Sequence, residues 1–169
     1  MNILTGESTE AWFGGEVPAA TRELLRQAAT APAVERSTLL WTAQALAPHA
    51  LPIYYALYKH HAQRREFELA ERAARRGLAE AAHAADLRDD GQHLDGSAAD
   101  FAANGPARFW LFTLKALAFI ALRSGRPDEA RALLARIAAV GPEHRVGDEV
   151  VAALLGAAGG ADTDSRSNR

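Results

Sequence analysis

The chain has 169 residues, of which 49% are apolar, and most of these are Ala and Leu, a composition that favours helices over strands. Its 19 basic and 21 acidic residues nearly balance, so the protein has no charge field that would attract nucleic acid or an anionic membrane. The sequence contains no Cys, which excludes disulfides, thiolate nucleophiles and Cys-ligated metals and is consistent with a cytoplasmic location.

Residues 1–16 are expected to form an N-terminal arm that lies outside the repeat pattern described below. Residues 1–10 contain no basic segment followed by an apolar run, so no secretory signal is predicted. The longest apolar stretch, residues 109–122, is shorter than the ~20 residues that a bilayer span needs. It therefore predicts a buried helix.

From residue 17 onward the sequence follows a period of 34 residues, which is typical of helix-turn-helix repeats. The first repeat spans residues 17–50, the second 51–84 and the third 111–144. The positions where this period expects Leu, Ala, an aromatic residue or Pro are held by Leu40, Ala43, Pro48, Tyr54, Leu57, Ala70, Ala74, Leu114, Leu117, Ala118, Ala130, Leu134 and Pro142. The second repeat begins directly after the first, so both match the template in the same register, and chance rarely produces such an agreement.

The third repeat matches best, because Gly125 suits the end of one helix and Pro127 the start of the next. The second repeat departs from the pattern at two positions. Tyr58 stands where a small residue is usual, and Gly77 occupies position 27. We therefore expect a looser N-terminal pair of repeats and a regular third one.

Residues 85–110 interrupt the phase between the second and third repeats. We expect the preceding helix to continue to Arg88 and a loop to follow over 92–105, with a helical turn within 97–103. After the third repeat, residues 147–155 predict a capping helix that covers the last apolar face. Residues 156–169 have little to bury and are expected to be a disordered tail.

Together these matches resemble the tetratricopeptide repeat (TPR) family over residues 17–144. The resemblance implies an all-α, short TPR-like helical solenoid of three antiparallel helix pairs plus the capping helix. Members of that family act as scaffolds or adaptors that bind a peptide or a helix in a concave groove. The amino-acid sequences of residues 47–51, 109–112 and 145–147 also resemble those of small three-repeat proteins encoded beside bacterial nitrogen-fixation genes.

The resemblance also implies which residues line the groove, because fixed positions of each repeat's first helix face it. These candidate partner-binding residues are Tyr55, Lys59, Gln63, Phe112, Lys115, Phe119 and Arg123. The family's Lys and Asn clamp for acidic C-termini is not present. This apolar surface could be covered in two ways. An amphipathic helix of a partner docks there, or the inserted segment, with Leu94 and Phe101, folds back and fills it.

No catalytic signature is found in the sequence, which has no phosphate loop, nucleophile elbow or metalloprotease helix. We therefore expect no enzymatic activity and no cofactor. His60 and His61 are neighbours that point about 100° apart on a helix, so no metal site is expected, even with His83 and His93 downstream. The basic cluster Arg64, Arg65, Arg72, Arg75 and Arg76 is interpreted as a solvated face with Glu68 and Glu71 at ion-pair spacing.

Two function classes follow from this interpretation. The first is a non-catalytic protein-protein interaction module, an adaptor or an assembly factor. The second is a dedicated secretion or folding chaperone, although the inserted segment is unusual for that class. A structural homodimer that uses the apolar groove for self-association is the third possibility.

Overall fold

The computed structural model describes residues 13, 17–87, 96–141, 143 and 146–164. Every regular element within these ranges is a helix, and no strand occurs among them, which confirms the all-α prediction. No helix in the described part of the chain combines the length and the apolar character needed to cross a membrane. The helices are α2 (Ala19–Thr30), α3 (Ala33–Leu46), α4 (Leu51–Gln63), α5 (Phe67–Ala84), α6 (Pro106–Arg123), α7 (Pro127–Val140) and α8 (Glu149–Asp164).

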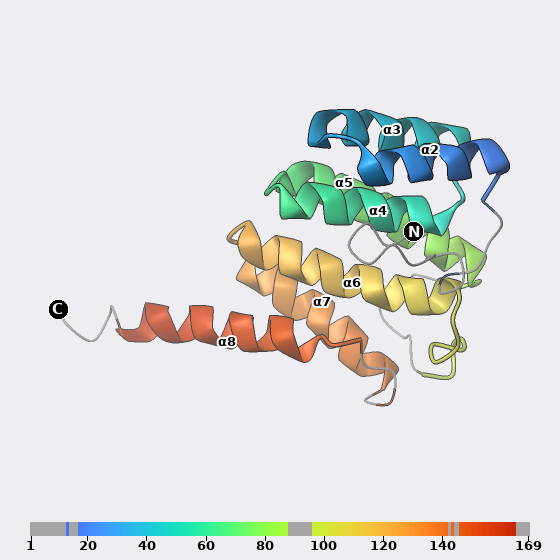
Figure 1. Cartoon of the computed structure of the whole chain (residues 1–169). Coiled ribbons are helices and arrows are strands. Elements are labelled where there is room, and N and C mark those ends of the chain that lie inside the picture. Colours follow the sequence, from blue (N-terminus) through green and yellow to red (C-terminus); the bar gives the residue numbers. More distant parts are fainter. Residues whose placement is uncertain (1–12, 14–16, 88–95, 142, 144–145, 165–169) are drawn as a thin grey trace.

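The helices are arranged as consecutive pairs that follow the order of the chain (Figure 1). Helix α2 packs on α3, α4 on α5, and α6 on α7. The pairs are joined by contacts of α3 with α4 and of α5 with α6, and α4 also touches α6. Helix α8 lies against α6 and α7, and its C-terminal part projects beyond them in Figure 1.

The turn between α4 and α5 has the same backbone geometry as the turn between α6 and α7. Arg65 (φ 60°) and Gly125 (φ 74°) both adopt the left-handed conformation, and they lie 60 positions apart, as Ala70 and Ala130 do. The hydrogen bonds also correspond, since Glu66 N–H donates to the His61 carbonyl and Arg126 N–H donates to the Ala121 carbonyl, both at 2.9 Å. Such bonds satisfy carbonyls at a helix end. The two turns therefore repeat one structural unit at the spacing that the sequence predicted.

Small residues let these helices approach closely. Ala43, Ala70, Ala74, Ala118 and Ala130 are all fully buried, at the positions where the repeat pattern expected Ala. Larger side chains fill the remaining space between the pairs, and the biggest fully buried ones are Trp110, Tyr54, Phe13, Phe101 and Phe109. The core therefore forms where Ala on one helix faces an aromatic or aliphatic side chain on the next.

The segment between α5 and α6 differs from the prediction mainly at its first end. Helix α5 ends at Ala84 rather than Arg88, because Asp86 turns the chain with a φ of 51° and Leu87 N–H bonds back to the Ala82 carbonyl. Helix α6 begins at Pro106, directly after the predicted loop of residues 92–105 and five residues before the predicted start of the third repeat, since proline suits the first turn of a helix. The described residues 97–103 form turns and bends rather than the predicted helical turn.

Helix α8 is longer than the predicted cap of residues 147–155. It extends through residues 156–164, where the sequence predicted a disordered tail, although three of these nine residues are Gly, which has a low helix propensity. Among the large apolar residues of the predicted capping helix, Val151 is buried, whereas Val150 and Leu154 are 63% and 44% exposed. Residues 165–169, most of the N-terminal arm, Leu94, His93 and Pro142 lie outside the described residues.

Candidate partner-binding groove

A groove of about 550 Å³ runs between α4 and α6 and is closed on one side by the start of α8. Aromatic and aliphatic side chains form most of its lining, with two lysines among them. The lining residues are Tyr55, Tyr58, Lys59, Ala62, Gln63, Phe112, Lys115, Ala116, Phe119, Ile120, Gly147, Val150 and Val151. Six of the seven candidate residues from the sequence lie here, and only Arg123, exposed at the end of α6, is missing from the lining.

Helical spacing explains why these residues share one surface. On α4, Tyr55, Lys59 and Gln63 follow each other at steps of four, so they stand one above the other on the same face. On α6, Phe112 and Phe119 are seven residues apart, which is two turns, with Lys115 between them. The contact between α4 and α6 brings the two faces together.

The two lysines differ in how the protein uses them. The ammonium of Lys115 donates to the Val146 carbonyl just before α8 and lies 5.0 Å from the centre of the Phe112 ring. Burial lowers the pKa of Lys115, while Asp148 and Glu149 oppose that shift. Lys115 therefore holds the start of α8 against α6, a role that its sequence position did not indicate.

Lys59 is the second cation of the groove and lies half-buried on α4. Its ammonium sits 4.9 Å from the centre of the Tyr55 ring and donates to the Tyr55 hydroxyl at 3.1 Å. The ring orients the lysine without neutralising it. No acidic residue is among the described residues that line the groove, but Asp148 and Glu149 offset the charge of Lys115, so Lys59 supplies the positive charge that a bound molecule would meet.

Phe13 of the N-terminal arm closes one end of the groove. Its side chain is 1% exposed, and its ring centre lies 5.3 Å from that of Tyr55, 4.8 Å from Phe109 and 6.0 Å from Phe112. Tyr55 and Phe112 belong to the groove lining, so the arm enters the fold directly beside the groove. The sequence analysis did not identify Phe13, because its partners are more than 40 positions away.

The inserted segment does not fill the groove in the part of it that the structure describes. Phe101 is fully buried, but it packs against Trp110, with ring centres 6.2 Å apart. The guanidinium of Arg136, a residue of α7, also lies 5.2 Å from the centre of the Trp110 ring. Phe101 therefore covers the side of α6 that faces α7, and it is not among the groove residues.

His60 and His61 are closer than their helical positions suggested, with ring centres 4.9 Å apart, and Glu66 completes a compact group of possible metal ligands. Both nitrogens of His61 are nevertheless engaged: Nε2 accepts from the Trp41 indole N–H at 3.1 Å, and Nδ1 lies 2.6 Å from the Glu66 carboxylate. Indole can only donate, so it fixes the proton on Nδ1. This tautomer opposes metal binding at Nδ1, and the group instead links α3, α4 and the start of α5.

His60 is 2% exposed, and its buried Nε2 has no hydrogen-bond partner among the described residues. Desolvation lowers its pKa, with His61, Arg36 and Arg64 adding to the shift and Glu66 opposing it. The unfolded chain therefore binds a proton more readily than the folded one. Stability is expected to fall as the pH drops below about 6.5, the ordinary histidine value, with a slope of up to about 1.4 kcal/mol per pH unit.

The His60→Leu variant, which has a similar volume, isolates this contribution. Urea unfolding of both proteins between pH 5 and pH 8 should show the variant gaining stability relative to the wild type as the pH falls. If the difference in unfolding free energy is the same at every pH, the assignment of acid sensitivity to His60 is wrong.

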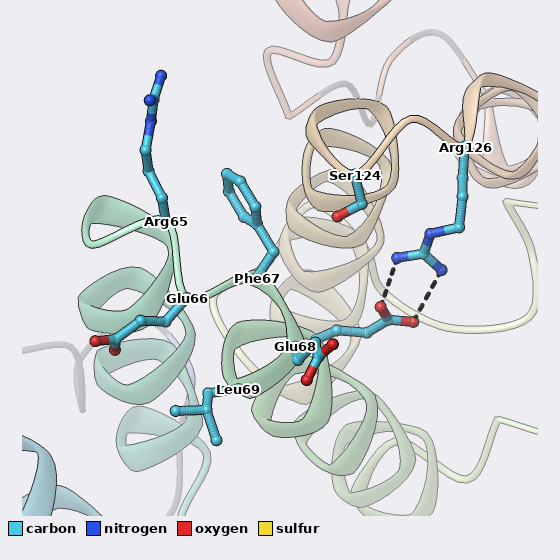
Figure 2. Close-up of a pocket in the computed structure, with 8 residues that line it drawn as sticks. Arg65, Glu66, Phe67, Glu68, Leu69, Ser124 and Arg126 are labelled. Carbon is cyan, nitrogen blue, oxygen red and sulfur yellow. Dashed lines mark hydrogen bonds and ion pairs between the residues drawn. The ribbon is translucent and has the colours of Figure 1, made fainter.

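A second, more polar hollow of about 700 Å³ lies between the α4–α5 turn, the start of α5 and the α6–α7 turn (Figure 2). It is lined by Arg65, Glu66, Phe67, Glu68, Leu69, Glu71, Ser124 and Arg126. Of its two basic side chains, Arg126 bonds the carboxylate of Glu71 at 2.6 Å, which lowers the pKa of that carboxyl. An anion would have to displace this carboxylate, so the hollow is a weaker candidate site than the groove.

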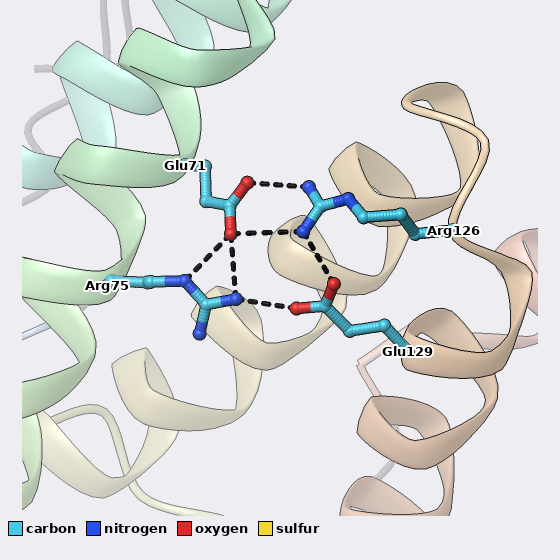
Figure 3. Close-up of polar contacts among 4 residues, drawn as sticks. All are labelled: Glu71, Arg75, Arg126 and Glu129. Carbon is cyan, nitrogen blue, oxygen red and sulfur yellow. Dashed lines mark hydrogen bonds and ion pairs between the residues drawn. The ribbon is translucent and has the colours of Figure 1, made fainter.

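Glu71 belongs to a four-residue ion-pair network that joins α5 to α7 (Figure 3). The predicted pair of Glu71 with Arg75 is confirmed at 2.7 Å. Arg126 and Glu129, which the sequence analysis did not assign to it, complete the network across the helix pairs. The basic cluster here stabilises the packing of the pairs, as networks do better than isolated surface pairs.

The fold and the groove define an all-helical protein with an apolar, positively charged surface between two of its helix pairs. In comparisons with protein-family models, with curated proteins and with solved structures, nothing matches this chain. The site must therefore be interpreted from its own geometry and chemistry.

Proposed function

We propose that the protein is a non-catalytic interaction module of the tetratricopeptide type, an adaptor or assembly factor that binds a partner protein in the groove between α4 and α6. The observation that carries the proposal is the lining of this groove, where six residues expected from the repeat pattern meet. The correspondence of the α4–α5 and α6–α7 turns supports the repeat assignment.

The chemistry of the groove favours a helix as the bound element. Its walls are helices whose backbone hydrogen bonds are internal, so they offer no row of free N–H and C=O groups to an added strand. A helix satisfies its own backbone and can place an apolar face against Tyr58, Phe119 and Ile120. Lys59 at the rim would pair with a carboxylate beside that face.

A capture experiment with matched variants tests the proposal. Tagged protein would be incubated with extract of the native cells, and the retained proteins would be quantified by mass spectrometry. The variant Lys59→Ala with Phe119→Ala removes a cation and an apolar anchor from the groove. We expect it to retain at least about tenfold less partner, or about 1.4 kcal/mol of binding energy, as hot-spot losses typically do.

The control is Leu46→Ala, which truncates an apolar side chain that is 62% exposed on α3 and does not line the groove. It should retain the partner at the wild-type level, and thermal melting should show all three proteins folded. Undiminished retention by the groove variant would refute the groove assignment. Recovery of a second copy of this chain, lost in the variant, would favour the homodimer instead of an adaptor.

A further inference from the structure

We propose that residues 1–12 of this same chain occupy the groove between α4 and α6 when no partner is bound, and so compete with the partner. The inference rests on the proposed function, because it describes how access to that same groove is regulated. Three observations lead to it: the position of Phe13, the charge of the groove lining, and the composition of the twelve residues before Phe13.

Phe13 sets where this segment begins. Its ring is buried against Tyr55 and Phe112, which line one end of the groove. The residues immediately before Phe13 are therefore tethered at the mouth of the groove. Such a tether gives them an effective concentration on the order of millimolar, so weak contacts suffice for occupancy.

The segment has the composition that the groove requires. Residues 1–12 include Ile3, Leu4 and Trp12, which could cover apolar surface, and the acidic residues Glu7 and Glu10. They contain no Lys and no Arg. Lys59 gives the lining a positive charge, whereas Asp148 and Glu149 offset that of Lys115, so the acidic residues of the segment complement Lys59.

The length of the segment also matches the groove. The face of α4 from Tyr55 to Gln63 extends for roughly 12 Å at the helical rise of about 1.5 Å per residue. A helix from Leu4 to Phe13 would extend for roughly 14 Å by the same rise. Leu4 would then lie near the far end of the groove, beside Gln63 on α4.

The absence of Cys from the chain allows a direct test. The variant Leu4→Cys with Gln63→Cys places one thiol in the segment and one at the far end of the groove lining, so any intramolecular disulfide formed under mild oxidation must join these two sites. The control pairs Leu4→Cys with Ala132→Cys, an exposed alanine on α7, which does not line the groove. We expect an intramolecular bond to form about tenfold faster in the groove pair than in the control.

Charge reversal tests the electrostatic part of the proposal. Adding Glu7→Lys and Glu10→Lys to the groove pair should slow cross-linking roughly fivefold, the effect of about 1 kcal/mol of lost ion pairing. Adding Glu68→Lys, an exposed residue of α5 that does not line the groove, should leave the rate unchanged.

The outcomes separate this inference from the proposed function. Equal rates in the groove pair and the control, or a disulfide only between two chains, would refute occupancy by residues 1–12, while the capture experiment could still succeed. Rapid intramolecular cross-linking together with a failed capture experiment would instead show that the groove serves its own chain alone.

Discussion

Replacing Trp110 by Ala is expected to destabilise the protein by about 3–5 kcal/mol, the usual cost of truncating a fully buried large aromatic residue. Trp110 lies near the start of α6 and is 0% exposed. The Phe101 ring and the Arg136 guanidinium both lie close to its ring. Its removal leaves a cavity at the point where the inserted segment is anchored to the helix pairs. Equilibrium unfolding in urea, followed by circular dichroism, measures the loss.

The variant Trp110→Phe provides the control for this prediction. The indole Nε1 is buried without a hydrogen-bond partner among the described residues, so Phe removes an unsatisfied donor while it keeps most of the ring. We expect Trp110→Phe to lower the free energy of unfolding by less than half as much as Trp110→Ala does. Equal losses in the two variants would show that ring burial is not what Trp110 contributes.

The second large effect is expected at Gly77, where α5 passes closest to α4. A Cβ atom at this position would lie 2.7 Å from the Tyr54 Cβ and 3.3 Å from Cε1 of Phe109. Ala normally stabilises a helix by about 1 kcal/mol relative to Gly, but separating two packed helices costs about 1–3 kcal/mol. The contact is with the rigid base of the Tyr54 side chain, so Gly77→Ala should be destabilising by about 1–2 kcal/mol.

Gly156 is the matched control, because it also lies in a helix and a Cβ there meets nothing within 4 Å. Gly156→Ala should increase the helical circular dichroism signal or leave it unchanged, and it should not lower the melting temperature. A drop in melting temperature for Gly77→Ala with no drop for Gly156→Ala is the expected pattern. If both variants behave alike, close packing at Gly77 is not what requires glycine.

Gly77 also shows why a departure from a sequence pattern can be misinterpreted. In the sequence it counted against the second repeat, because this position is rarely glycine in the repeat pattern. In the structure it accommodates Tyr54, a neighbour on the preceding helix of the same repeat. Glycine here makes room for the base of a neighbouring side chain, and a template that scores each position alone does not detect such a contact between two positions.

Local signals in the sequence were sufficient for the helical class, the order of the helix pairs and the faces of α4 and α6. These depend on helical periodicity and on turn residues such as Gly125 and Pro127, whose influence extends over a few neighbours. The candidate residues of the groove were implied by the resemblance to a repeat family, and helical spacing places those of each helix on one face.

Only the tertiary structure decided what each of those faces meets. The burial of Phe13 beside the groove, the packing of Phe101 on Trp110 and the bond from Lys115 to the Val146 carbonyl all join residues distant in sequence, or lie outside the repeat pattern. Such contacts depend on how whole helices pack and on which apolar surfaces remain uncovered. No local sequence pattern encodes the combined effect of these long-range contacts. The sequence by itself therefore determined the helices and their faces, whereas the packing of distant segments decided how the groove is bounded.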